Sequence, residues 1–182
     1  MTKRPMSPAA LGIAGIYFLL LLLFLWPATD YLTTVWAPRL GEVEWRYGAI
    51  GLLTAHLLTP VLAMGLAMVV AFALRHRTTL KALSVLSLVG ALILIVAMGF
   101  FALDVMQLRN VRPPESLPSF QAGALIAELK HFTAFIALTL LGLGGWSTAG
   151  RLAEPGEAAG KPKRGPDLVK KPEGKRKEEA EL

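Results

Sequence analysis

Three ionisable side chains stand close together in the segment "IAELKHFTAF" at residues 126–135: Glu128, Lys130 and His131. A carboxyl group and an imidazole three positions apart are neighbours on one face of a helix, so Glu128 and His131 can act together, while Lys130 is turned away. The surrounding sequence is apolar enough to cross a membrane, and ionisable groups inside a membrane are rare and usually functional. The first interpretation is therefore an intramembrane site.

His56 is the second residue that could contribute to such a site. It begins a row of mostly small residues, which predicts a helix face that packs against a neighbour: His56, Pro60, Ala63, Ala67 and Ala71. A similar row continues from His131 through Phe135, Leu138, Gly142 and Gly145. Two histidines on different helices at one depth are what bis-histidine ligation of a b-type haem requires. His56 and His131 are thus candidate cofactor ligands, and with Glu128 they could instead hold a metal or move protons.

The alternative interpretation is that these groups mark the edge of the bilayer. At about 1.5 Å per residue, Lys130 lies about 31 Å from Arg151, which is close to the full thickness of a hydrocarbon core. Similar counts bring His56 and Asp104 to the same depth. Charged side chains at this level can reach water and need no partner, so the polar cluster of Asp104, Glu128 and Lys130 is expected at the boundary.

The elements that must position these residues are four long apolar segments. The chain has 182 residues and is 54% hydrophobic, above the usual apolar share of a soluble domain. We expect an all-α integral membrane protein, a four-helix transmembrane bundle over residues 1–150, because each segment is close to the length that spans a bilayer. The expected helices lie near 9–26, 47–74, 80–103 and 122–147.

Basic residues predict the orientation of the bundle. Most of the 19 Lys and Arg fall near the two termini and between the second and third helices, whereas the other connections mix both signs. The positive-inside rule then places both termini in the cytoplasm, an N-in/C-in arrangement, and we expect a bacterial inner (plasma) membrane. The first helix is too long for an ordinary signal peptide and is interpreted as an uncleaved anchor.

The two connections on the side opposite the termini, and a proline in the second helix, also bear on the fold. Residues 26–45 and 107–119 are expected to be plain connectors. Asp30 is placed like a helix cap, so a short surface helix after it is the alternative for the first connector. The prolines of the second favour an extended, stiff chain. Pro60 removes one backbone hydrogen bond and can kink the second helix, although proline is also commoner in transmembrane helices than in soluble ones.

The composition changes after Gly150. Residues 151–182 are basic and then acidic and contain few bulky apolar residues, which predicts a disordered cytoplasmic tail. Its basic side chains could contact anionic lipid headgroups or a protein partner: Lys161, Lys163, Arg164, Lys170, Lys171, Lys175, Arg176 and Lys177. The tail has no aromatic residue on which bases could stack, so nucleic-acid binding is not expected.

The sequence contains no motif that indicates enzymatic chemistry. Phosphate-binding glycine loops, zinc-protease signatures and serine elbows are missing, and the absence of cysteine excludes thiolate sites. We therefore expect a non-enzymatic accessory or scaffolding subunit, without a resident cofactor, that acts through helix packing and its tail. Other membrane subunits or a second copy are its expected partners. The alternatives are a haem-binding, metal-binding or proton-handling bundle that uses His56, Glu128 and His131, and a small transporter or channel subunit.

Overall fold

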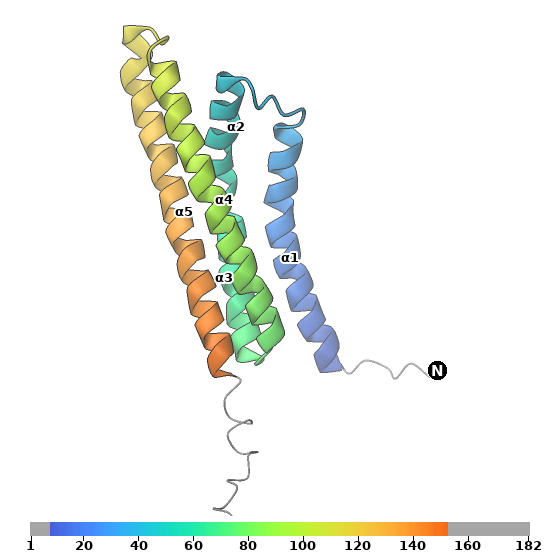
Figure 1. Ribbon diagram of the computed structural model, residues 1–182. Helices are drawn as coiled ribbons and strands as arrows, with labels where there is room; N and C mark the ends of the chain where they lie inside the picture. Colours follow the sequence, from blue (N-terminus) through green and yellow to red (C-terminus); the bar gives the residue numbers. More distant parts are fainter. Residues whose placement is uncertain (1–7, 153–182) are drawn as a thin grey trace, which may run out of the picture.

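The computed structural model describes residues 8–152, and every regular element in that range is helical (Figure 1). In chain order the elements are α1 Pro8–Thr34, α2 Val43–His56, α3 Leu58–Ala73, α4 Arg77–Arg109, the 3₁₀ helix η1 Pro114–Ser116 and α5 Leu117–Arg151. The all-helical prediction is confirmed for these residues. The tail residues expected to be disordered lie outside the described range.

Three of these helices are long and apolar enough to cross a membrane, and there are four such segments if the bent pair α2–α3 counts as one. This agrees with the four apolar segments of the sequence, but the helices are longer than expected. α4 and α5 each extend beyond the apolar runs at 80–103 and 122–147. Pro118 stands in the first turn of α5, where its missing N–H breaks no helical hydrogen bond, so the helix begins before the apolar run.

The segment expected as one helix at 47–74 is broken at Leu57 into α2 and α3, which meet at an angle of 45°. Pro60 explains the break, because it has no N–H to donate to the carbonyl of His56 and its ring crowds that carbonyl. Val61 resumes the helical pattern by donating to the carbonyl of Leu57 at 3.2 Å. The kink that Pro60 can cause is therefore present in the structure.

The first connector also differs from the expectation, since α1 continues past residue 26 to Thr34. Asp30 lies inside this helix and does not begin a new one. The hydroxyls of Thr33 and Thr34 donate to the Asp30 carbonyl at 2.9 and 2.8 Å, which satisfies a backbone acceptor in the last turn. The short surface helix considered for this region is therefore absent, and the true connector is shorter than predicted.

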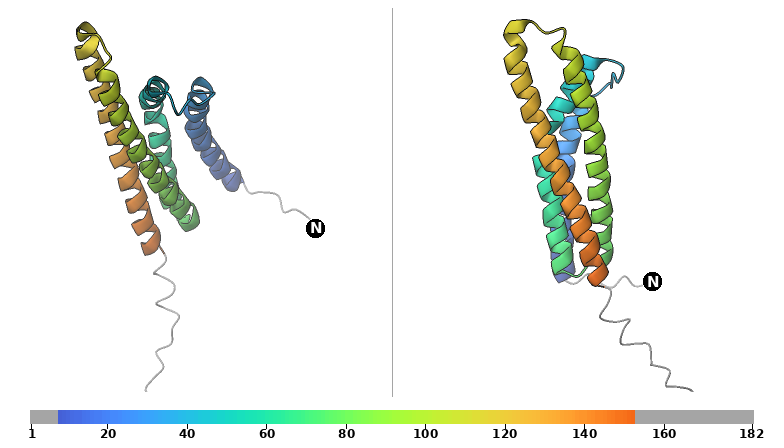
Figure 2. Two further views of the ribbon diagram at one scale, coloured as in Figure 1. Left: turned by 45° about the horizontal axis from the view of Figure 1, so that its top comes forward. Right: turned by 60° about the vertical axis from the view of Figure 1, so that its left-hand side comes forward.

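α4 and α5 form an antiparallel pair along their whole length, as the two views of Figure 2 show. Small residues allow the close approach. A Cβ atom on Gly142 would lie 2.6 Å from Cγ of Leu88, and one on Gly145 would collide with Oγ of Ser84. The predicted packing role of this glycine row is confirmed.

α1 lies at the side of this assembly and contacts chiefly α3 (Figures 1 and 2). None of its residues is buried. At its N-terminal half, the hydroxyl of Tyr17 lies 3.2 Å from Nδ1 of His76, which precedes α4. α1 is thus the least enclosed helix of the bundle.

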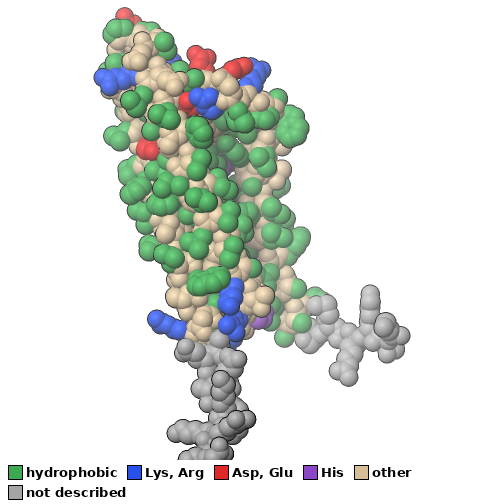
Figure 3. Space-filling view, viewed as in Figure 1, with side chains coloured by type: hydrophobic (Ala, Val, Ile, Leu, Met, Phe, Trp, Pro, Cys, Tyr) green, Lys and Arg blue, Asp and Glu red, His purple; other side chains and the backbone are tan. Residues whose placement is uncertain are grey.

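The two ends of the molecule carry different charges (Figure 3). We call the end with the α1–α2 and α4–α5 connections the distal end, and the opposite end, where α3 turns into α4, the terminal end. Arginine and lysine side chains gather at the terminal end: Arg75, Arg77, Lys81 and Arg151. Both signs occur at the distal end, and an apolar band separates the two ends.

Candidate functional site

The distal half of the bundle contains a polar cluster between α2, α4 and α5, which we call the distal cluster: Arg46, Asp104, Glu128 and His131. Its first part is an ion pair. Arg46 of α2 donates from Nη2 to Oδ1 of Asp104 at 2.6 Å and from Nε to Oδ2 at 3.2 Å. This two-bond geometry is the strongest arrangement that an arginine and a carboxylate can form.

Asp104 is completely buried, whereas the side chain of Arg46 keeps 21% of its exposure. Arg46 also donates from Nη1 to the carbonyl of Leu40 at 2.6 Å, so the connector before α2 helps to hold the guanidinium. The expectation that Asp104 needs no partner at the water boundary is wrong. Its carboxylate points into the helix interface, where only a buried cation can compensate it.

The second part of the cluster is the pair Glu128 and His131 on α5. His131 is completely buried, and neither ring nitrogen has a hydrogen-bond partner within the described residues. The backbone carbonyls of Ala127 and Ile50 lie near the ring without completing a bond of good geometry. Oε2 of Glu128 is likewise buried and unpartnered. Two neighbouring ionisable groups thus lack the partners that buried polar atoms normally have.

Aromatic rings connect the two parts. Tyr47 stacks on Phe101 with the ring centroids 5.1 Å apart and the planes 9° apart. Phe101 in turn lies 5.8 Å from the ring of His131. Phe101 of α4 faces His131 of α5, and the two helices are antiparallel. Asp104 lies three residues beyond Phe101 toward the distal end, and Glu128 lies three residues beyond His131 in the same direction. The two carboxyl groups are therefore at about the same level. Two carboxyl groups therefore share one layer, with an imidazole in the next.

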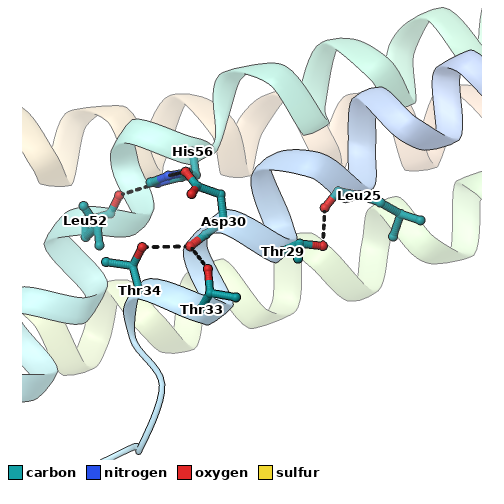
Figure 4. Close-up of polar contacts among 7 residues, drawn as sticks. All are labelled: Leu25, Thr29, Asp30, Thr33, Thr34, Leu52 and His56. Atoms are coloured by element: carbon teal, nitrogen blue, oxygen red, sulfur yellow. Dashed lines mark hydrogen bonds and ion pairs between the residues drawn. The ribbon is translucent and has the colours of Figure 1, made fainter.

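The two histidines that the sequence places at one depth lie apart in the structure. Nε2 of His56 lies 3.0 Å from Oδ2 of Asp30 on α1, and Nδ1 lies 3.2 Å from the carbonyl of Leu52, as Figure 4 shows. His131 instead faces α4 and α2. The two rings occupy different helix interfaces, so we propose no haem or metal site that they share. No group of three or more histidine, aspartate or glutamate side chains in residues 8–152 is placed so that it could hold a metal ion.

The remaining predicted residues divide into two sets. Lys130 is exposed and turned away from Glu128 and His131, as predicted. The basic tail residues from Lys161 to Lys177 lie outside the described range. Sequence reasoning missed Arg46 and Asp30 as partners, because each is separated from its partner by a long stretch of chain: 58 positions for Arg46 and 26 for Asp30.

Comparisons with models of protein families, with curated proteins and with solved structures found no match.

Proposed function

We propose that the chain crosses a bacterial inner membrane four times, through α1, the bent pair α2–α3, α4 and α5, with both termini in the cytoplasm. The lengths and apolar character of these segments support four spans. The basic residues at the terminal end support its cytoplasmic placement. In this orientation the distal cluster lies near the opposite boundary of the membrane.

We further propose that the protein is a non-enzymatic accessory subunit whose distal cluster takes up and releases protons. The observation that carries this proposal is the burial of the His131 ring and of the Oε2 atom of Glu128 without hydrogen-bond partners within the described residues. Ionisable groups in apolar surroundings cost free energy, so a helix interface made only for packing would contain apolar side chains at these positions. Small packing residues do occur on the same face of α5, at Ala124 and Ala134.

The arrangement suits proton exchange. A carboxyl group can give a proton to an imidazole on the same helix face, directly or through a water molecule, because each can act as donor or acceptor. The guanidinium of Arg46 compensates the charge of the Asp104 carboxylate, so Asp104 and Glu128 differ in their electrostatic surroundings. The Glu128–His131 pair is therefore the part of the distal cluster that is available to take up and release protons.

Infrared difference spectroscopy on the full chain in lipid nanodiscs tests this function. We expect a change of pH to produce a carboxyl band that Glu128→Gln removes and an imidazole band that His131→Gln removes. Glu44→Gln serves as the control, because Glu44 is exposed on α2 and lies outside the cluster. Identical spectra for the wild type and Glu128→Gln, over the range in which the protein stays folded, would overturn the proposal.

A further inference from the structure

A second feature lies on the other side of α2–α3, between α1 and α4. Two adjoining cavities of about 430 and 310 Å³ occupy this space and share Phe24, Met64 and Leu86 in their walls. Together they form a groove along the helix axes, which we call the lateral groove. Figure 3 shows the hollow between α1 and the rest of the bundle from the side.

The groove is long and narrow. Along α1 the larger cavity extends from Phe24 to Leu32, about 12 Å at the helical rise per residue, and the smaller one continues it to Tyr17. Half of a hydrocarbon core is about 15 Å thick. The larger cavity therefore has the depth of one leaflet, which suits a flexible hydrocarbon chain better than a compact ligand.

The walls of the larger cavity are apolar except at its distal end, where His56 and Tyr31 line it. Asp30 reaches the same place by its contact with His56. Only Oδ2 of Asp30 is engaged by His56, and the side chain is 63% exposed, so the carboxylate can still accept hydrogen bonds from an outside donor (Figure 4). An apolar slot thus ends at a carboxylate at the depth where lipid headgroups lie.

We propose that the lateral groove binds one acyl chain of an amine-bearing phospholipid, whose ammonium group contacts Asp30. The charge is complementary, because an ammonium group donates hydrogen bonds to a carboxylate and a charge-assisted bond is stronger than a neutral one. A quaternary ammonium head has no N–H to donate, and an anionic head is repelled by Asp30. The open side of the groove, where α1 is not buried, lets the chain enter from the bilayer.

Native mass spectrometry of the full chain, mixed with phosphatidylethanolamine, phosphatidylcholine or phosphatidylglycerol in detergent, tests the site. We expect one tightly bound phosphatidylethanolamine. Asp30→Asn is expected to lower the preference for this lipid over phosphatidylcholine about tenfold, in line with the loss of one charged hydrogen bond. Equal retention of all three lipids by the wild type would overturn the assignment of the headgroup.

Two substitutions test the chain-binding part, because Leu86 lies where the cavities meet and Ile93 lies in the larger one. Both side chains are partly exposed, so a larger residue can be placed there without disrupting the core. Leu86→Trp and Ile93→Trp are expected to abolish lipid retention. Leu92→Trp is the matched control, because Leu92 is exposed on the same helix and lines neither cavity.

Circular dichroism and size-exclusion chromatography establish that each variant is folded and monomeric. Retention of the lipid by a folded Leu86→Trp or Ile93→Trp variant would overturn the proposal. So would a wild-type dimer with α1 cross-linked to α4 of the second copy, because the groove would then be filled by protein.

Discussion

At the scale of single residues, the ion pair between Arg46 and Asp104 decides the stability of the distal cluster. Asp104→Asn removes the negative charge but leaves the guanidinium of Arg46 partly buried without compensation. Removing one partner of such a pair leaves the other without its counter-charge and destabilises the fold. We expect a loss in the free energy of unfolding, measured by denaturant titration of the protein in detergent micelles.

An exposed ion pair on the same molecule provides the control. Arg39 and Glu42 lie 3.5 Å apart, but both side chains are more than half exposed, so Glu42→Gln should change stability by less than about 1 kcal/mol. Equal losses in the two variants would show that burial does not strengthen the Arg46–Asp104 contact.

The sequence could identify Glu128 and His131 as a pair, because their spacing on one helix is a local property. It also predicted that Lys130 points away. It could not identify Arg46 as the partner of Asp104, since that contact depends on the order in which helices pack. The placement of His56 against α1, away from His131, depended on the same unknown.

At the scale of the elements, the antiparallel pair α4–α5 depends on glycine. Gly145→Ala places a methyl group against Oγ of Ser84 and near Sδ of Met68. Overpacking of this kind costs about 1–3 kcal/mol, more than the gain in helix propensity from glycine to alanine. We expect lower thermal stability of the helical signal measured by circular dichroism.

Gly144, next to Gly145 in the chain, provides a matched control for the Gly145→Ala variant. A Cβ atom on Gly144 would meet nothing within 4 Å, so Gly144→Ala keeps the gain in propensity without the collision. This variant should be as stable as the wild type or more so. A Gly145→Ala variant that is equally stable would mean that α4 and α5 separate at little cost.

Helix periodicity and apolar length were enough to predict the helical segments, and the small residues at every third or fourth position predicted the face of α5 that packs. The helix ends were harder to predict. Polar residues such as Asp30 and Gln107 mark the end of an apolar run, yet they continue the helix because their backbones still find partners within it. A hydropathy pattern marks only the apolar part of each helix, and the helices extend beyond it.

At the scale of the whole molecule, the two proposed sites occupy separate interfaces. The distal cluster lies between α2, α4 and α5, whereas the lateral groove lies between α1 and α4 with α3 behind it. The bent pair α2–α3 separates them and contributes to both. Substitutions in the groove should therefore leave the infrared bands of Glu128 and His131 unchanged, because distant sites without shared partners behave additively.

The charged ends of the molecule predict its orientation in a membrane. The turn between α3 and α4 carries Arg75 and Arg77, whereas the α4–α5 connection combines Arg112 with Glu115. The positive-inside rule counts lysine and arginine in short connections, so the α3–α4 turn should stay in the cytoplasm and the α4–α5 connection should be exported. An alkaline phosphatase reporter, which is active only outside the cytoplasm, should be active when fused after Val111. The same reporter fused after Leu152 should be inactive. Activity of the second fusion and silence of the first would reverse the orientation and place the distal cluster at the cytoplasmic boundary.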